Sequence, residues 1–149
     1  MKGLVIHEFG DINSHHVEEF DDPVAGPDDV IIDVHAIGLN FPDTLMLRGK
    51  YQMWPDRPFI PGRDAAGIVS SLGANVTTVK IGDRVSCQVL WGAFAEKVKA
   101  PETKVFKIPD ALDFITAAGM VTTYNTAYVA VYERGNIQHG ETVLITGAS

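Results

Sequence analysis

The sequence predicts a mainly β domain that is followed by the first part of an α/β unit. Short apolar stretches at regular spacing, separated by turn residues, occupy the chain up to Pro109 and are typical of a barrel or sandwich. Beyond Pro109 the apolar residues recur at helical spacing, and one last apolar stretch runs into Gly147. The order of strands, helix and single strand therefore indicates two units of different structural class.

The first two strands are expected at residues 2–9 and 14–20, on either side of a Gly-Asp-Ile-Asn turn. Residues 21–29 contain Pro, Gly and Asp, whose backbone preferences are those of a loop. In residues 30–38, apolar side chains at alternate positions predict a half-buried strand. The N-terminal part of the chain is thus expected to be three strands joined by turns.

A short helix is expected next, between Asn40 and Gly49. Asn40 is a suitable N-cap, Pro42 stands near the position where a helix tolerates proline, and glycine commonly follows the end of a helix. Residues 51–62 contain three prolines and predict an ordered loop.

Four more short strands complete the predicted β domain, at residues 65–73, 83–90, 92–100 and 104–108. Helical periodicity then covers residues 113–120 and 122–135, and Gly135 is a stop signal for the second helix. Residues 142–147 again have the composition of a strand. A parallel strand needs neighbours joined by crossover connections, and the sequence up to Ser149 contains none of these.

The composition is that of an ordinary globular protein, with 46% hydrophobic and 21% charged residues among 149. A net charge of −7 argues against binding to nucleic acid or to an anionic membrane. The sequence has no apolar stretch of membrane-spanning length and no secretory signal, so a soluble cytoplasmic protein is expected. The single cysteine, Cys87, excludes a disulfide within the chain and is expected to be a half-buried strand residue.

The last seven residues, VLITGAS, have the pattern that opens a phosphate-binding turn. Dinucleotide sites place glycines directly after a strand, so that the backbone approaches the pyrophosphate and the next helix points its N–H groups at it. Residues 143–149 contain only the strand and the first glycine. Taken alone this is a weak signal, because turns of the type strand-Gly-Ala-Ser are common.

Four longer segments carry a more specific signal than any single motif, and they follow one another along nearly the whole chain. They are residues 35–51, 58–85, 92–101 and 122–149. Together they resemble the quinone oxidoreductase branch of the medium-chain dehydrogenase/reductase family, which is alcohol dehydrogenase-like. The resemblance implies a GroES-like β-barrel catalytic domain over residues 1–121 and the truncated start of a Rossmann domain over residues 122–149.

The resemblance also implies an activity. In such enzymes NADPH lies in the cleft between the two domains and gives hydride to a quinone or another α,β-unsaturated carbonyl. NADH stays an alternative, because the residues that distinguish the two cofactors follow the next strand. The full-length protein is expected to be a homodimer whose partner molecules are small substrates. The 149-residue chain by itself is expected neither to bind NADPH tightly nor to turn over, because the phosphate helix and the adenosine pocket are missing.

Two other functions are kept open at this point. A GroES-like barrel could serve as a binding module without catalysis, but such a module needs no helix and glycine-ending strand after residue 121. An enoyl or acryloyl thioester reductase of the same superfamily is the second alternative. Leu45 favours it, because many quinone oxidoreductases have a cofactor-lining tyrosine at that position.

Zinc is not expected, although zinc alcohol dehydrogenases share the fold. They have a cysteine where this chain has Asn40, and Gly-His-Glu where it has Gly62-Arg63-Asp64. A catalytic zinc needs three Cys, His or carboxylate ligands, and arginine has no lone pair to offer. His15 and His16 are adjacent on an expected strand, so they point to opposite faces. No metal ligands are therefore assigned.

The site residues follow from the resemblance. Asn40 matches the asparagine near the nicotinamide and the substrate, although it is also a helix cap. Tyr51 matches a tyrosine at the mouth of the cleft, where it stacks on a planar ring or, alternatively, packs against Trp54 and the prolines. Thr126 approaches the nicotinamide. The start of the phosphate turn consists of Gly147, Ala148 and Ser149.

Three neighbouring charged residues are given lesser roles. Asp43 is expected to be a solvated carboxylate in the first helical turn, where the helix dipole favours it. Arg63 and Asp64 are expected to form a local ion pair at the start of a strand. The last strand, with its edges unpaired, is expected to fray or to pair with another copy of the chain.

Overall fold

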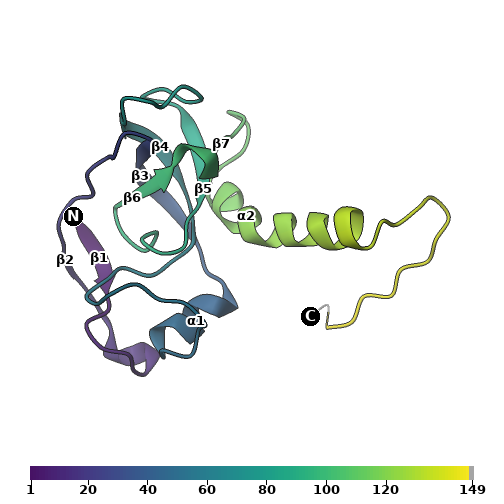
Figure 1. Ribbon diagram of the computed structural model, residues 1–149, viewed down its shortest axis with the longest axis horizontal. Coiled ribbons are helices and arrows are strands. Elements are labelled where there is room, and N and C mark those ends of the chain that lie inside the picture. Colours follow the sequence, from purple (N-terminus) through teal and green to yellow (C-terminus); the bar gives the residue numbers. More distant parts are fainter. Residues whose placement is uncertain (148–149) are drawn as a thin grey trace.

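The computed structural model describes residues 1–147 and shows a curled antiparallel sheet from which one long helix projects (Figure 1). The main sheet has five strands in the order β6-β3-β4-β5-β7. Their bounds are β3 Asp29–Gly38, β4 Asp64–Leu72, β5 Arg84–Gln88, β6 Lys97–Pro101 and β7 Val105–Lys107. A two-stranded ribbon of β1 (Lys2–Val5) and β2 (His16–Glu19) lies beside it. The GroES-like β-barrel expected from the resemblance is thereby confirmed.

The sheet curls because its two longest strands are irregular. The register between β3 and β4 shifts twice, between Ile31 and Ile32 and between Val34 and Ala36, and such bulges bend a strand. At Gly67 of β4 the backbone of Asp33 comes so close that an added Cβ would overlap the Asp33 carbonyl oxygen. Glycine is therefore required where the curled strands approach most closely.

The barrel interior is filled by the alternating apolar residues that the sequence predicted. Ile32 and Val85 are fully buried, and Val69 is 1% exposed. The same cluster contains Val5, Val30, Ile60, Ala65, Val79, Cys87, Val89, Ala93, Phe94, Val98, Ala100 and Val105. Residues from all five sheet strands contribute, so the core is one continuous body.

The short helix α1 (Phe41–Leu47) forms where it was expected, directly after Asn40. Its last residues, Met46 and Leu47, pack against Ile6 and Phe59 in a second apolar cluster. Gly49 follows with a φ of 64°, the left-handed conformation that favours glycine after a helix. Short 3₁₀ turns, η1 (Ile12–Ser14) and η2 (Glu102–Lys104), complete the connections.

The two helical stretches expected after Pro109 form one helix, α2 (Phe114–Tyr128), which continues into a π-helix, η3 (Val129–Arg134). Asp113 caps it, because its side chain accepts a 2.8 Å hydrogen bond from the Thr116 amide. No break occurs at residue 121, where Val121 is 6% exposed, and one turn earlier Ala117 and Ala118 pack against Ala66 of β4. The predicted domain boundary between residues 121 and 122 therefore falls inside α2, and the division into domains stays a prediction.

The strand expected at residues 142–147 is not formed, and the segment after η3 extends away and turns back (Figure 1). Val143, Leu144 and Ile145 are 48%, 87% and 68% exposed. An isolated strand has unpaired N–H and C=O groups on both edges and nothing to bury its side chains against. Ala148 and Ser149 lie outside the described residues. Over residues 1–147, no helix combines the length and the apolar character that crossing a membrane requires.

Candidate functional site

Asp64 lies at the centre of a buried hydrogen-bond network at the start of β4. The residue is 1% exposed. Its Oδ2 accepts a 2.9 Å hydrogen bond from the Asn40 amide, and its Oδ1 accepts a 2.8 Å bond from the Thr122 hydroxyl. Gln88, which pairs with Asp64 across β4 and β5, donates to Thr122 Oγ1 at 2.8 Å. The network therefore joins the residue before α1, two strands and α2.

Glycine at the end of β3 lets α2 reach this network. Gly38 pairs with Asp64 across the sheet. A Cβ at Gly38 would lie 2.6 Å from the carbonyl oxygen of Ala118, a distance that real side chains do not adopt. The backbones of β3 and α2 are thus in direct contact, and Thr122 follows Ala118 by one helical turn.

Asn40 is held in one orientation by two sets of contacts. Its side-chain nitrogen faces the Asp64 carboxylate, which can only accept. It also forms a capping box with Asp43, whose Oδ2 accepts a 2.7 Å bond from the Asn40 backbone N–H. A carboxamide has two N–H donors and two oxygen lone pairs, so part of its capacity stays available in a fixed direction. Asn40 therefore caps α1 and can also orient a bound group.

Asp43 was expected to be solvated, and this expectation is wrong, because the residue is only 3% exposed. Burial raises the pKa of Asp43, and the nearby Asp64 carboxylate raises it further, whereas the bond from the Asn40 backbone and the Arg63 charge lower it. Its Oδ1 is buried and has no hydrogen-bond partner among residues 1–147. The raised pKa makes Asp43 easier to protonate than a solvent-exposed aspartate.

Arg63 pairs with Tyr51 and not with Asp64, so the expected local ion pair is wrong. Arg63 Nη1 donates a 2.9 Å hydrogen bond to the Tyr51 hydroxyl, and the guanidinium carbon lies 5.8 Å from the Tyr51 ring centroid. Neighbouring residues of an extended chain point to opposite sides, and Asp64 already faces Asn40 and Thr122. The structure thereby places a cation and a phenol together.

The ring of Tyr51 packs on the apolar cluster that contains Met46 and Phe59. Trp54, the alternative neighbour that the sequence suggested, packs edge-on against Phe9 with ring centroids 5.4 Å apart. Tyr51 is therefore anchored through its ring and through its hydroxyl.

Thr126 lies one helical turn beyond Thr122, and residues four apart share a helix face. Thr126 is exposed, and no hydrogen bond joins its side chain to the Asp64 network within the described residues. Gly147 has a φ of 68°, which is the left-handed conformation that a glycine turn uses. Within the described residues, neither Thr126 nor Gly147 forms a hydrogen bond with Asn40 or Tyr51.

Two members of the network were missed by sequence reasoning. Thr122 belongs to a segment that was already singled out, and its spacing of four from Thr126 was an available signal. No sequence pattern pointed to Gln88, because its hydrogen bond to Thr122 depends on the pairing of β4 with β5.

Cys87 plays no chemical part here. It is fully buried in the barrel core, not half-buried as expected. Burial raises the pKa of Cys87 to about 12, so the thiol stays protonated at neutral pH. Within residues 1–147, no three His, Cys, Asp or Glu side chains gather into a metal-binding group, and zinc independence stays a prediction.

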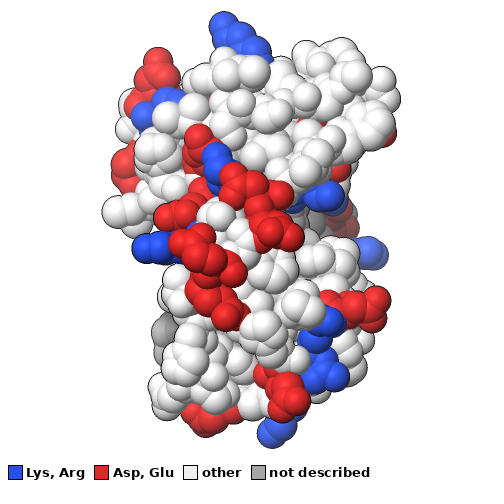
Figure 2. Space-filling model, turned by 90° about the vertical axis from the view of Figure 1, so that its left-hand side faces the viewer, with Lys and Arg blue, Asp and Glu red and all other residues white. Residues whose placement is uncertain are grey.

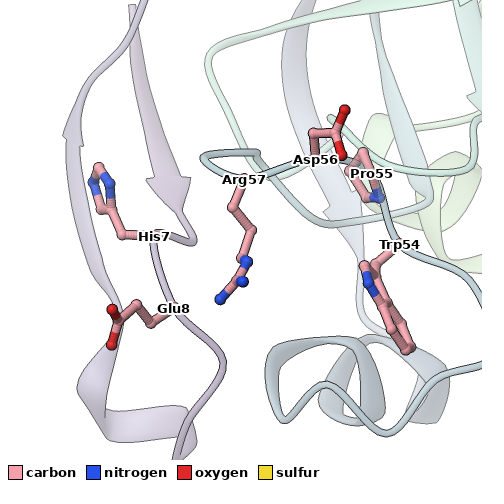
Figure 3. Close-up of a pocket in the computed structure, with 6 residues that line it drawn as sticks. All are labelled: His7, Glu8, Trp54, Pro55, Asp56 and Arg57. Atoms are coloured by element: carbon pink, nitrogen blue, oxygen red, sulfur yellow. The ribbon is translucent and has the colours of Figure 1, made fainter.

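Two surface hollows have to be distinguished. One, of about 390 Å³, is lined by Arg63, Gln88, residues 89–91, Lys99, Pro101 and Lys104. The larger, of about 610 Å³, lies between His7 and Glu8 on one wall and residues 54–57 on the other (Figure 3). No residue assigned to the site from the sequence lines this larger hollow. The hollow beside Arg63 is the one that adjoins the candidate site.

Comparison with known proteins identifies the family of the chain. Residues 26–110 match the alcohol dehydrogenase GroES-like domain. The chain belongs to this family. It is 43% identical over 124 residues to quinone oxidoreductase-like protein 2 of Rattus norvegicus, covering 83% of this chain and 35% of that protein.

Solved structures of related proteins have the same fold as this chain. The human synaptic vesicle membrane protein VAT-1 homolog-like protein superposes with a TM-score of 0.90 at 36% identity, over 94% of this chain and 45% of that one. Escherichia coli quinone oxidoreductase, complexed with NADPH, superposes with a TM-score of 0.85 at 30% identity, over 90% and 41%. The expected relationship to quinone oxidoreductases is confirmed, and the chain spans less than half the length of these proteins.

Proposed function

We propose that the chain is the catalytic-domain part of an NADPH-dependent, zinc-independent reductase of quinones or other α,β-unsaturated carbonyls. The observation that supports this most is that two consecutive residues hold the two candidate groups, Asn40 through Asp64 and Tyr51 through Arg63. The relationship to a quinone oxidoreductase that was solved with NADPH supports the choice of cofactor. Bound NADPH would supply the hydride, so the protein contributes geometry and polarity.

Asn40 has the properties of a group that orients the cofactor amide or the substrate carbonyl. Its contacts with Asp64 and with the first turn of α1 fix its carboxamide before anything binds. Such pre-organisation lowers a barrier because no side chain has to be ordered during the reaction. Asp64 and Thr122 act through Asn40 and are positioning residues.

Tyr51 has the properties of a proton donor to the substrate oxygen. Reduction of an enone or quinone by hydride leaves a negative charge on that oxygen, and a proton must follow. The Tyr51 hydroxyl accepts its hydrogen bond from Arg63, so its own proton is free to point toward the substrate. Arg63 stabilises the phenolate that remains after the proton has left.

The cofactor's phosphate end is assigned to the turn that begins at Gly147. The left-handed φ of this glycine fits a turn whose backbone approaches a pyrophosphate closely. Ala148 and Ser149 are assigned to the same cofactor-binding motif, and Thr126 on the exposed face of α2 approaches the nicotinamide in this proposal. The full-length protein is proposed to be a cytoplasmic homodimer.

The test is steady-state reduction of a quinone, an enone and an enoyl thioester by the full-length protein, with NADPH and with NADH. We expect Asn40→Ala to lower kcat/KM for the quinone about a hundredfold, the usual cost of a misplaced reactant. Tyr51→Phe is expected to lower kcat more than it raises KM, and Tyr124→Phe, which changes an exposed tyrosine of α2, is the matched control. Oxidation of neither cofactor with any acceptor would overturn the proposal.

A thioester reductase is the second candidate. Leu45 supports it, because an apolar residue stands in α1 where many quinone oxidoreductases have a tyrosine. In the same assay, a kcat/KM for the enoyl thioester well above that for the quinone would establish it. Equal loss of both activities in Asn40→Ala would show that one site serves both substrates.

A further inference from the structure

The hollow of about 390 Å³ beside Arg63 combines positive charge with an apolar wall. Three of its lining residues are cations, Arg63, Lys99 and Lys104, and no carboxylate lines it. Its lining also includes Leu90, which is 46% exposed, and Trp91. Its volume lies in the range of sites that bind small molecules.

This positive charge contrasts with the rest of the molecule. The chain has 19 acidic and 12 basic residues, and Figure 2 shows acidic side chains gathered across one face. Clustered cations in such a chain repel one another unless counter-charges lie nearby. A site without its own carboxylates therefore favours an anion from outside.

The three cations are only weakly satisfied within residues 1–147. Arg63 donates to the neutral Tyr51 hydroxyl, and Lys104 takes part in no ion pair there. Lys99 Nζ lies 3.9 Å from Asp29 Oδ2, at the outer limit of an ion pair, and half of its side chain is exposed. Each cation can therefore bind an added oxyanion without first losing a strong partner.

We propose that this hollow binds the anionic group of the substrate, a carboxylate or phosphate carried by an apolar body. The inference rests on the proposed function, since Arg63 links the hollow to Tyr51. The oxyanion lies between Lys99 and Lys104, and the apolar body lies along Leu90 and Trp91. The reducible carbon then extends past Arg63 toward Tyr51 and Asn40.

The two tryptophans of the chain provide a direct binding test. Trp91 lines this hollow, and Trp54 lines the larger hollow of Figure 3. The chain is titrated with anthraquinone carboxylic acid, with its neutral carboxamide and with crotonyl-coenzyme A, while the two indole N–H signals are followed by heteronuclear NMR. We expect the carboxylate to shift the Trp91 signal saturably, with little effect on Trp54 and little effect of the carboxamide.

Charge-removing variants then locate the anion. Lys104→Gln is expected to weaken binding of the carboxylate about two- to fivefold, the value of an exposed ion pair, and Lys99→Gln with Lys104→Gln about tenfold. Lys80→Gln, which removes an exposed lysine outside the hollow, is the matched control and should leave the affinity unchanged. A dispersed NMR spectrum in each variant shows that the fold is intact.

The outcomes separate the two proposals. Stronger binding of the coenzyme A thioester than of the carboxylate, with the same lysine dependence, supports a phosphate as the anion. Equal affinity for the carboxylate and the carboxamide, or no effect of the two lysine changes, overturns the anion site. Because no cofactor or turnover enters this measurement, that result leaves the reductase proposal intact, and reduction of a neutral quinone tests the latter alone.

Discussion

The two halves of α2 lie in opposite environments. In the first half, Ala117 and Ala118 are fully buried against the barrel and Val121 is 6% exposed. In the second half, Tyr124 and Tyr128 are 68% and 56% exposed, although they recur at the same helical spacing. The difference lies in the neighbours, because Ala117 and Ala118 pack in an apolar cluster with Ala66 of β4, whereas Figure 1 shows the end of the helix projecting from the sheet.

The same contrast separates two strand-type sequences. Val69 lies in β4, which has hydrogen-bonded neighbours on both sides, and is 1% exposed. Ile145 lies in a comparable apolar stretch without neighbours, and it forms no strand and is 68% exposed. Local sequence therefore creates the capacity for a strand, whereas pairing and burial decide whether the strand forms.

The largest effect on stability is expected when the same substitution, isoleucine to alanine, is made in the barrel core and in the unpaired segment after η3. Ile32→Ala empties a fully buried position in the barrel core and should lower the free energy of unfolding by about 2–5 kcal/mol. Ile145→Ala makes the same change at an exposed position and should stay within about 0.5 kcal/mol. Urea denaturation followed by far-UV circular dichroism measures both. Similar losses at the two positions would mean that residues 143–145 are packed in solution.

The junction between the two halves of α2 should give an intermediate effect. Thr122→Val removes the hydroxyl between Gln88 and Asp64 and leaves both polar groups with one partner fewer. We expect a loss of about 1–3 kcal/mol, the cost of an unsatisfied buried group. Thr126→Val, one turn farther along the same face, is the matched control and should be nearly neutral. Equal losses would show that the network does not anchor α2.

A third prediction uses pH to compare a buried carboxylate with a partly exposed one. The pKa of Asp43 is raised in the folded state, mainly by burial, so the folded protein binds a proton there at a higher pH than the unfolded chain does. As pH falls from the folded to the unfolded pKa, the free energy of unfolding of wild type should therefore rise relative to that of Asp43→Asn. Glu102 has a lowered pKa, because the backbone amides of Thr77 and Thr78 bond to it. Wild type should therefore lose its advantage over Glu102→Gln as pH falls through the folded pKa.

Urea midpoints at several pH values, read as differences between each variant and wild type, isolate the two groups from the other carboxylates. Parallel pH trends for the two variants would contradict the opposite environments that the structure gives them.

Much of the barrel could be predicted from the sequence, since it follows from local patterns. Alternating apolar residues predicted β3, and the Asn40 cap with Gly49 predicted α1. At the site, the resemblance led to Asn40 and Tyr51, which the structure holds through two consecutive residues, Asn40 through Asp64 and Tyr51 through Arg63. Periodicity and motifs were sufficient wherever the relevant contacts are short in sequence.

The Asp64 network could not be predicted in this way, because its bonds join residues far apart in sequence. Asp64 is 24 residues from Asn40 and 58 from Thr122, and Gln88 is 34 from Thr122. Whether Asp64 turns inward or pairs with Arg63 depends on the strand register, and that register shifts twice between β3 and β4. The final strand was predicted wrongly for the complementary reason, since its pattern is local and its partners are not present.

The smallest effect on stability, with a clear effect on association, is expected in the segment after η3. Val143, Leu144 and Ile145 form a run of exposed apolar residues with unpaired backbone groups, which is the kind of surface that pairs with another copy of the chain. Leu144→Lys should leave the free energy of unfolding within about 0.5 kcal/mol and should lower the concentration-dependent association of the 149-residue chain in sedimentation velocity. Ile115→Lys replaces a single residue of similar exposure on the first turn of α2 and serves as the control. If both variants reduce association equally, scattered exposed apolar residues drive the association. If only Leu144→Lys reduces it, the unpaired strand sequence drives the association, and the contrast between paired and unpaired segments extends from folding to assembly.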